Sequence, residues 1–105
     1  MREYRLYLTT VQTKKEAKQM AEALLKYKAA ACVNIVDKMT SMYMWENQLC
    51  VDDECLLIIK TRSDLYEKVK KIVFTLHKYD LPEFIEIPIT GGFEGYLGWI
   101  DESIR

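Results

Sequence analysis

Residues 32–61 read CVNIVDKMTSMYMWENQLCVDDECLLIIKT, and their pattern determines the predicted architecture. β-Branched residues are dense at its start, and no helical stripe can be drawn there. A turn is expected at residues 46–48, which divides the stretch into strands over residues 32–45 and 49–61. The sequence therefore predicts one long β-hairpin.

The two arms of this hairpin differ in their pattern of apolar residues. Residues 55–59 are apolar at every position, as expected of a strand that is covered on both faces. The outer arm carries large apolar side chains on both faces, more than one helical layer could cover in so small a domain. We therefore expect an interface that includes Tyr43 and Trp45, together with Met39, Met42 and Met44.

A strand and a helix are predicted on the N-terminal side of the hairpin. Residues 4–10 are rich in β-formers, and Tyr4, Leu6 and Leu8 share one face by the period of two. Thr13 followed by Glu16 is a capping box, so a helix is expected over residues 14–28. Its apolar face contains Ala17, Met20, Ala21 and Leu24.

The C-terminal side repeats this plan with a helix and a strand. Ser63 is expected to cap a helix whose apolar stripe contains Leu65, Val69, Ile72, Val73 and Leu76. A strand over residues 84–90 follows, and Pro88 in it indicates an edge strand. A short amphipathic helix, with apolar residues from Tyr96 to Ile104, is expected at the end.

The element order βαββαβ corresponds to two split βαβ units. We predict an α+β fold, a ferredoxin-like sandwich with an antiparallel four-stranded sheet, both main helices on one face, the long hairpin and a short C-terminal helix. At 105 residues the chain fits a single domain over residues 1–105. The helix-free sheet face, to which we assign Tyr7 and alternate apolar residues of the hairpin, needs cover, and self-association would provide it.

The composition indicates the cellular compartment of the protein and excludes some classes of binding partner. Fifteen Lys and Arg against sixteen Asp and Glu leave a net charge of −1, so no positive surplus is available for nucleic acid or an anionic membrane surface. No apolar run approaches the roughly 18 residues that cross a bilayer. The odd number of cysteines, three, without CxxC spacing and the lack of a signal-peptide pattern favour the cytoplasm.

Proteins with this architecture have several different functions, and the residues at particular positions of this chain exclude some of them. An RNA-recognition module would carry stacking aromatic residues on its central strands, but residues 54–59 contain none. A heavy-metal chaperone would place CxxC after the first strand, where residues 9–13 read TTVQT. The same loop lacks the glycines and arginine of an acylphosphatase-type phosphate cradle. No base and nucleophile pair is recognisable, so we expect a protein that is not an enzyme.

Five short strings at matching intervals resemble the CutA family of divalent-cation tolerance proteins. They are ACVN (31–34), YMWE (43–46), IKTR (59–62), HKYDLPE (77–83) and YLGW (96–99). The resemblance covers almost the whole chain. It implies a homotrimer joined through the hairpin and sheet edges, association with copper or another divalent cation, no catalysed reaction, and room for a further protein partner.

The resemblance also implies candidate site residues. Some bacterial members carry a strand-one cysteine and a second adjacent histidine as proposed copper ligands, and those positions are Thr9 and Leu76 in this chain. Only His77 of that set is retained, so any metal binding is expected to be weak.

Four further residues are implied as ligand-binding positions in a polar cleft between protomers. They are Cys32, Lys60, Tyr79 and Glu83. From the residues alone, a helix C-terminal cap is the favoured role of His77, and a small core residue is the favoured role of Cys32. Cys50 and Cys55 are five residues apart on one strand, so they should lie on opposite faces. An alternative function is a trimeric sensor of a nucleotide or metabolite, similar to PII signalling proteins.

Overall fold

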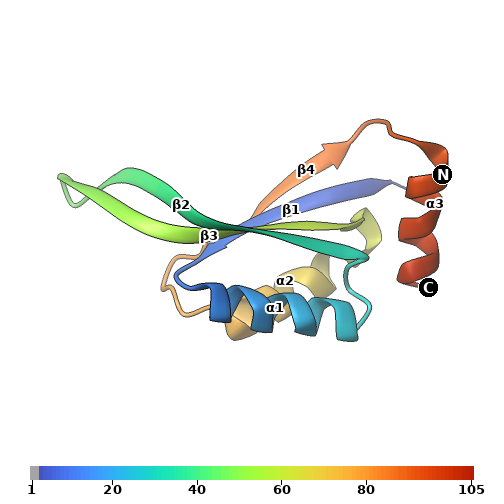
Figure 1. Cartoon of the computed structure of the whole chain (residues 1–105), viewed down its shortest axis with the longest axis horizontal. Helices are drawn as coiled ribbons and strands as arrows, with labels where there is room; N and C mark the ends of the chain where they lie inside the picture. Colours follow the sequence, from blue (N-terminus) through green and yellow to red (C-terminus); the bar gives the residue numbers. More distant parts are fainter. Residues whose placement is uncertain (1–2) are drawn as a thin grey trace.

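The computed structural model describes residues 3–105. Its elements are β1 (Tyr4–Val11), α1 (Lys14–Lys26), β2 (Cys32–Trp45), β3 (Gln48–Arg62), a 3₁₀ turn (Ser63–Leu65), α2 (Tyr66–Leu76), β4 (Ile85–Ile89) and α3 (Glu94–Ser103). The strands form one antiparallel sheet in the order β2-β3-β1-β4, and α1 and α2 cover the same face of it (Figure 1). The ferredoxin-like α+β sandwich is therefore confirmed, and β4 with its Pro88 is an edge strand as predicted.

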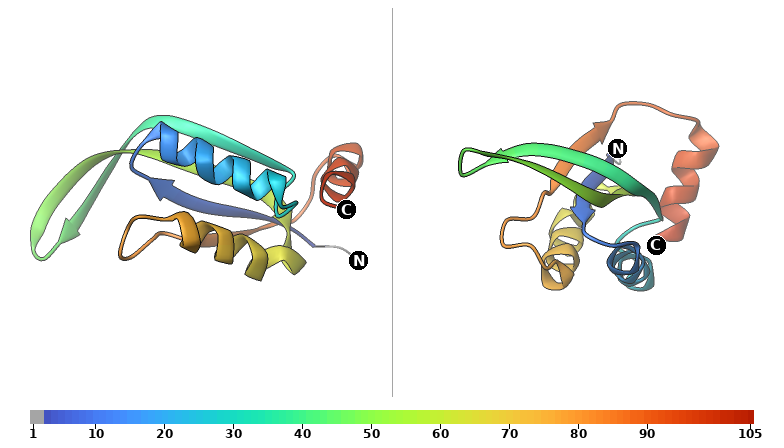
Figure 2. Two further views of the ribbon diagram at one scale, coloured as in Figure 1. Left: turned by 90° about the horizontal axis from the view of Figure 1, so that it is seen from below. Right: turned by 60° about the vertical axis from the view of Figure 1, so that its left-hand side comes forward.

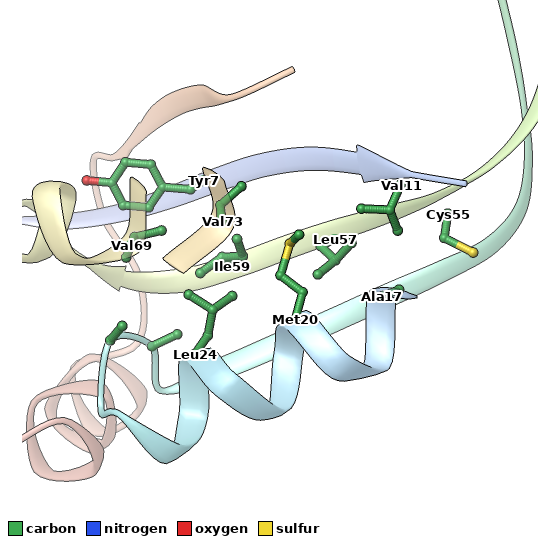
Figure 3. Packing of buried hydrophobic residues seen from close by; sticks show 12 residues of the cluster. Tyr7, Val11, Ala17, Met20, Leu24, Cys55, Leu57, Ile59, Val69 and Val73 are labelled. Atoms are coloured by element: carbon green, nitrogen blue, oxygen red, sulfur yellow. The ribbon is translucent and has the colours of Figure 1, made fainter. Parts of the chain in front are cut away.

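The core lies between the sheet and the two helices (Figure 3). Ala17, Met20 and Leu24 of α1 are fully or almost fully buried there, as the helical period predicted. They meet alternate residues of β3 and the inner face of α2, namely Cys55, Leu57, Ile59, Val69 and Val73.

Tyr7 belongs to this core, so its predicted place on the helix-free face is wrong. Its side chain is 0% exposed, and its ring lies parallel to that of Phe84, with centroids 5.4 Å apart. The hydroxyl group donates to Oε2 of Glu86 at 2.7 Å. Because the hydroxyl finds this partner at the sheet edge, the ring can be buried without leaving a polar group unpaired.

Two predicted helix ends differ from the structure. Helix α1 ends at Lys26 and not at residue 28, because Lys28 adopts a left-handed φ of 56°. The N–H groups of Lys28 and Ala29 then bond back to the carbonyls of Leu25 and Leu24, which closes the helix. Ser63 does not cap α2, since it starts a 3₁₀ turn whose side chains make no capping bond, and α2 begins at Tyr66.

The β2-β3 hairpin extends well beyond the two helices (Figures 1 and 2). Its tip is a two-residue turn in which Glu46 and Asn47 have φ of 50° and 63°. Positive φ at both central residues is the geometry that suits the twist of a hairpin. Beyond the sheet body the arm has little cover, and its exposed large apolar residues are Met42, Tyr43, Met44, Trp45, Leu49 and Val51.

The sheet face opposite α1 and α2 is largely uncovered, and we call it the open face. The strand registers place Leu8 between Ile58 and Ile85, and Leu6 beside Ile87. The sequence predicted that residues 55–59 are covered on both faces. Ile58 is only half-buried, so within this chain they are covered on one face.

Helix α3 lies at the end of the sheet away from the hairpin tip (Figure 1). Ile100 and Ile104 pack on Ala31. Asp101 receives a hydrogen bond from the Tyr4 hydroxyl at 2.6 Å and forms an ion pair with Arg62 at 3.2 Å. Over residues 3–105, none of the helices combines the length and apolarity that a membrane span requires.

Candidate functional site

His77 is the C-cap residue of α2, and both of its ring nitrogens are hydrogen-bonded. Nε2 lies 2.8 Å from the carbonyl oxygen of Thr10, and Nδ1 accepts from the N–H of Tyr79 at 3.2 Å. Because a carbonyl oxygen can only accept, this network assigns the proton to Nε2 of a neutral imidazole. A metal ion at Nδ1 would have to replace the bond from Tyr79.

Tyr79 joins the loop after α2 to the base of the hairpin arm. Its hydroxyl donates to Oε2 of Glu54 on β3 at 2.7 Å, and its ring lies 4.8 Å from that of His77 between centroids. Burial, and then the hydrogen bond to Glu54, raise the pKa of Tyr79 above its usual value. The loop is therefore fixed to β1 through His77 and to β3 through Tyr79.

A groove of about 1010 Å³ runs between the arm and this loop. Its walls include the aromatic side chains of Tyr43 and Trp45 and a single lysine, Lys78. The carboxylates along it are Asp52, Asp53, Glu54, Asp80 and Glu83. This balance of charge favours cations over anions as occupants.

Two groups in the groove have raised pKa values, the carboxyl group of Glu83 and the hydroxyl group of Tyr43. Partial desolvation, and then the negative charge of Glu54, raise the pKa of Glu83 above its usual value, since both disfavour the ionised carboxylate. Asp52 accepts a hydrogen bond from the Tyr43 hydroxyl, and chiefly for that reason the pKa of Tyr43 is raised to about 12.

The other two predicted ligand-binding residues lie at the far end of the sheet. Cys32 and Lys60 are directly opposite each other on β2 and β3. The Lys60 ammonium stands 5.6 Å from the ring centroid of Tyr96 on α3. Lys60 is six strand residues from Glu54, a separation of about 20 Å. Within one chain, therefore, Cys32 and Lys60 are brought together, but they are far from Tyr79 and Glu83.

The thiols do not gather around His77. Cys50 lines the groove, whereas Cys55 is buried on the helix-covered face, so their predicted opposite placement is confirmed. Cys32 is only partly buried, and its Sγ lies 3.9 Å from Oδ1 of Asn34. Among residues 3–105, no three His, Cys, Asp or Glu side chains are grouped as a metal site.

Sequence reasoning missed Glu54 and Thr10 as members of this site. Glu54 directly precedes the apolar run that begins at Cys55, but no motif in the sequence marks it as a site residue. Thr10 contributes its backbone carbonyl, which no side-chain pattern reveals. Both partners come from strands that are distant in sequence from the loop at Tyr79.

Comparisons with known proteins agree on one family. The family model described as CutA1 divalent ion tolerance protein matches residues 5–103. Protein CutA, chloroplastic, of Arabidopsis thaliana is 46% identical over 91% of this chain, which spans 53% of that protein. The divalent-cation tolerance protein CutA of Thermus thermophilus is 41% identical over 91% of the chain and 93% of its own length.

Solved structures show the same fold. CutA1 from Oryza sativa superposes with a TM-score of 0.94 at 42% identity, covering 98% of this chain and 94% of that one. The divalent ion tolerance protein CutA1 from Ehrlichia chaffeensis also gives a TM-score of 0.94, at 31% identity, over 100% and 98% of the two chains.

Proposed function

The chain belongs to the CutA1 divalent ion tolerance protein family, and on that premise we propose that it is a cytoplasmic homotrimer that takes part in tolerance of divalent metal ions. It binds copper or another divalent cation weakly and catalyses no reaction. We further propose that residues 1–105 act as one domain.

The observation that carries the proposal is the uncovered apolar surface. The open face presents Leu56, Ile58 and Ile85, and the arm adds Trp45 at 54% and Met44 at 64% exposure. Contiguous apolar surface of this kind marks an interface with another molecule. Within residues 3–105, β2 and β4 are the edges of the sheet and each pairs with one strand only; edge strands that are left open tend to pair with another chain.

The proposed threefold ring would also bring the two halves of the predicted ligand-binding set together. In a head-to-tail ring each interface joins two different patches, one from each protomer. Within one chain, about 20 Å of strand separates Cys32 and Lys60 from Tyr79 and Glu83. In a ring, the end of one chain that carries Cys32 and Lys60 can meet the end of the next chain that carries Tyr79 and Glu83. This arrangement supports the predicted cleft between protomers.

The metal-binding part of the proposal rests on His77 and on the carboxylates of the groove, whose wall begins at the next residue, Lys78. Imidazole nitrogen suits copper, and the acidic groove raises the local concentration of cations. A second protomer would have to supply the remaining ligands, since residues 3–105 of one chain contain no group of three. Binding should therefore be weak and should depend on assembly.

Sedimentation equilibrium at micromolar concentration tests the assembly. We expect three times the mass of one chain. A monomer over the whole concentration range would contradict the trimer, whatever the metal experiments show.

Titration calorimetry with Cu²⁺ tests the metal site. His77→Ala should lower the affinity at least about tenfold, because the only imidazole of the chain is lost. Tyr79→Phe is the matched control, since it disturbs the same loop but keeps the imidazole. Equal Cu²⁺ affinity in native protein and His77→Ala would rule out His77 as a ligand.

A further inference from the structure

The long hairpin has an irregularity where it leaves the body of the sheet. Val36 pairs with Leu56 and Met39 with Glu54, so two residues of β2, Asp37 and Lys38, lie opposite Cys55 alone. Such a β-bulge bends its strand and increases the local twist. Lys38 adopts a left-handed φ of 56°, which is unfavourable for a lysine and needs support from its surroundings.

That support comes from one carboxylate. Oδ1 of Asp37 accepts the N–H of Lys38 at 2.8 Å and the thiol of Cys55 at 3.1 Å. Cys55 is 2% exposed and belongs to the core, whereas Asp37 is exposed. Cys55 lies at one end of the core cluster (Figure 3), so its contact with Asp37 links the bulge, which lies at the surface, to the edge of the core.

The bulge also separates two parts of the hairpin that differ in cover. On one side Val33 and Ile35 pack on the core, and on the other side the exposed arm begins. Beyond the bond from Tyr79 to Glu54 at its base, the arm is mostly exposed, so the backbone at the bulge contributes to its direction. The views in Figure 2 show that the arm curves away from the plane of the sheet.

We propose that Asp37 and Cys55 form a clasp that fixes the bulge and thereby sets the direction of the hairpin arm. The thiol of Cys55 acts as a hydrogen-bond donor, which gives a cysteine in the core a role other than metal binding. The clasp is inferred from these contacts alone. That the direction of the arm matters for assembly depends on the proposed trimer.

The electrostatics agree with a protonated thiol and an ionised carboxylate. Burial, and then the hydrogen bond to Asp37, raise the pKa of Cys55. The same hydrogen bond is the main cause that lowers the pKa of Asp37. Both effects keep the donor and the acceptor in the forms that the contact requires.

Amide hydrogen exchange of the native full chain and its variants tests the clasp. Asp37→Ala and Cys55→Ala should each speed exchange in residues 38–54 by about tenfold, the effect of losing one hydrogen bond to a charged group. The double variant should be no faster than the faster single variant, because both changes remove the same contact. Cys55→Ser, whose hydroxyl can still donate, should recover most of the protection.

Asp53→Ala is the matched control, since it removes an exposed carboxylate from the same hairpin. It should leave exchange in residues 38–54 within about twofold of the native rate. Multiplying effects in the double variant, or an equal change in Asp53→Ala, would overturn the clasp. Sedimentation of the native protein and of each variant distinguishes the two proposals. A monomeric native protein whose bulge exchanges slowly would contradict the trimer but not the clasp.

Discussion

Thr9 and Thr61 are both fully buried on the helix-covered face of neighbouring strands, but their hydroxyl groups differ. Oγ1 of Thr61 donates to the carbonyl of Ala29 at 2.7 Å, whereas Oγ1 of Thr9 lacks a partner among the described residues. A buried hydroxyl without a partner costs free energy.

We predict that Thr9→Val raises the free energy of unfolding by about 1 kcal/mol, because it removes an unpaired polar atom at nearly constant shape. Thr61→Val should lower it by about 1–2 kcal/mol, since the Ala29 carbonyl loses its donor. Urea denaturation at one chain concentration measures both changes. A destabilised Thr9→Val would show that its hydroxyl has a partner.

The raised pKa of Tyr79 predicts a loss of stability in alkali. Its folded pKa lies above the unfolded value of about 10, so the unfolded chain releases its proton first. The stabilisation is complete below pH about 10 and is lost as the pH rises further. Tyr79→Phe should cost about 1 kcal/mol at neutral pH and flatten this decline.

Unfolding experiments at several pH values between about 8 and 11 measure this difference. Tyr7 also has a raised pKa and remains in the variant, so the decline should become shallower without disappearing. Parallel curves for the variant and the native protein would contradict the assignment to Tyr79.

At the scale of elements, the two main helices start differently. Oγ1 of Thr13 accepts the N–H of Glu16 at 3.2 Å and caps α1, as predicted. The turn before α2 has no side-chain cap, although Ser63 is the residue type that prefers this position. Ser63 is the first residue of the 3₁₀ turn and so does not occupy the N-cap position, which is held by Arg62 for the turn and by Leu65 for α2.

Replacing Thr13 and Ser63 separately tests which of the two caps a helix. Thr13→Ala should lower the free energy of unfolding by about 1 kcal/mol, the usual contribution of an N-cap. Ser63→Ala should change it by less than about 0.5 kcal/mol, since no capping bond is lost. Equal losses in the two variants, measured by thermal or urea unfolding, would mean that Ser63 does cap a helix in solution.

At the scale of the whole molecule, an elongated body of 45 × 26 × 23 Å has one sheet face and a long arm without cover. If a trimer provides that cover, folding and assembly are linked by mass action. The apparent Tm should then rise with chain concentration. A Tm that stays constant over a hundredfold range would contradict the link.

A single charge on the open face should separate the protomers. Ile58 is half-buried in the centre of that face, and Ile58→Lys would bury a charge in the interface while leaving one chain able to fold. We predict at least about a tenfold weaker association by sedimentation. Gln19→Lys is the control, since it adds the same charge on the exposed side of α1.

Local patterns in the sequence were sufficient for the element order and for most core residues. The helical period selected Ala17, Met20 and Leu24, and the apolar run at residues 55–59 located the central strand. These features follow from neighbours in the chain, because periodicity is set by the geometry of each element. The family was also evident, because its motifs are short and continuous.

Tertiary structure alone decided which face of β1 is buried and which site residues meet. Tyr7 and its neighbours are apolar on both faces, so only the position of Glu86 and Phe84 places the ring in the core. Likewise Tyr79 finds Glu54 across 25 residues of sequence, and Asp37 finds Cys55 across 18. Strand register and the bulge create these pairs, and both depend on contacts between segments that are distant in the chain.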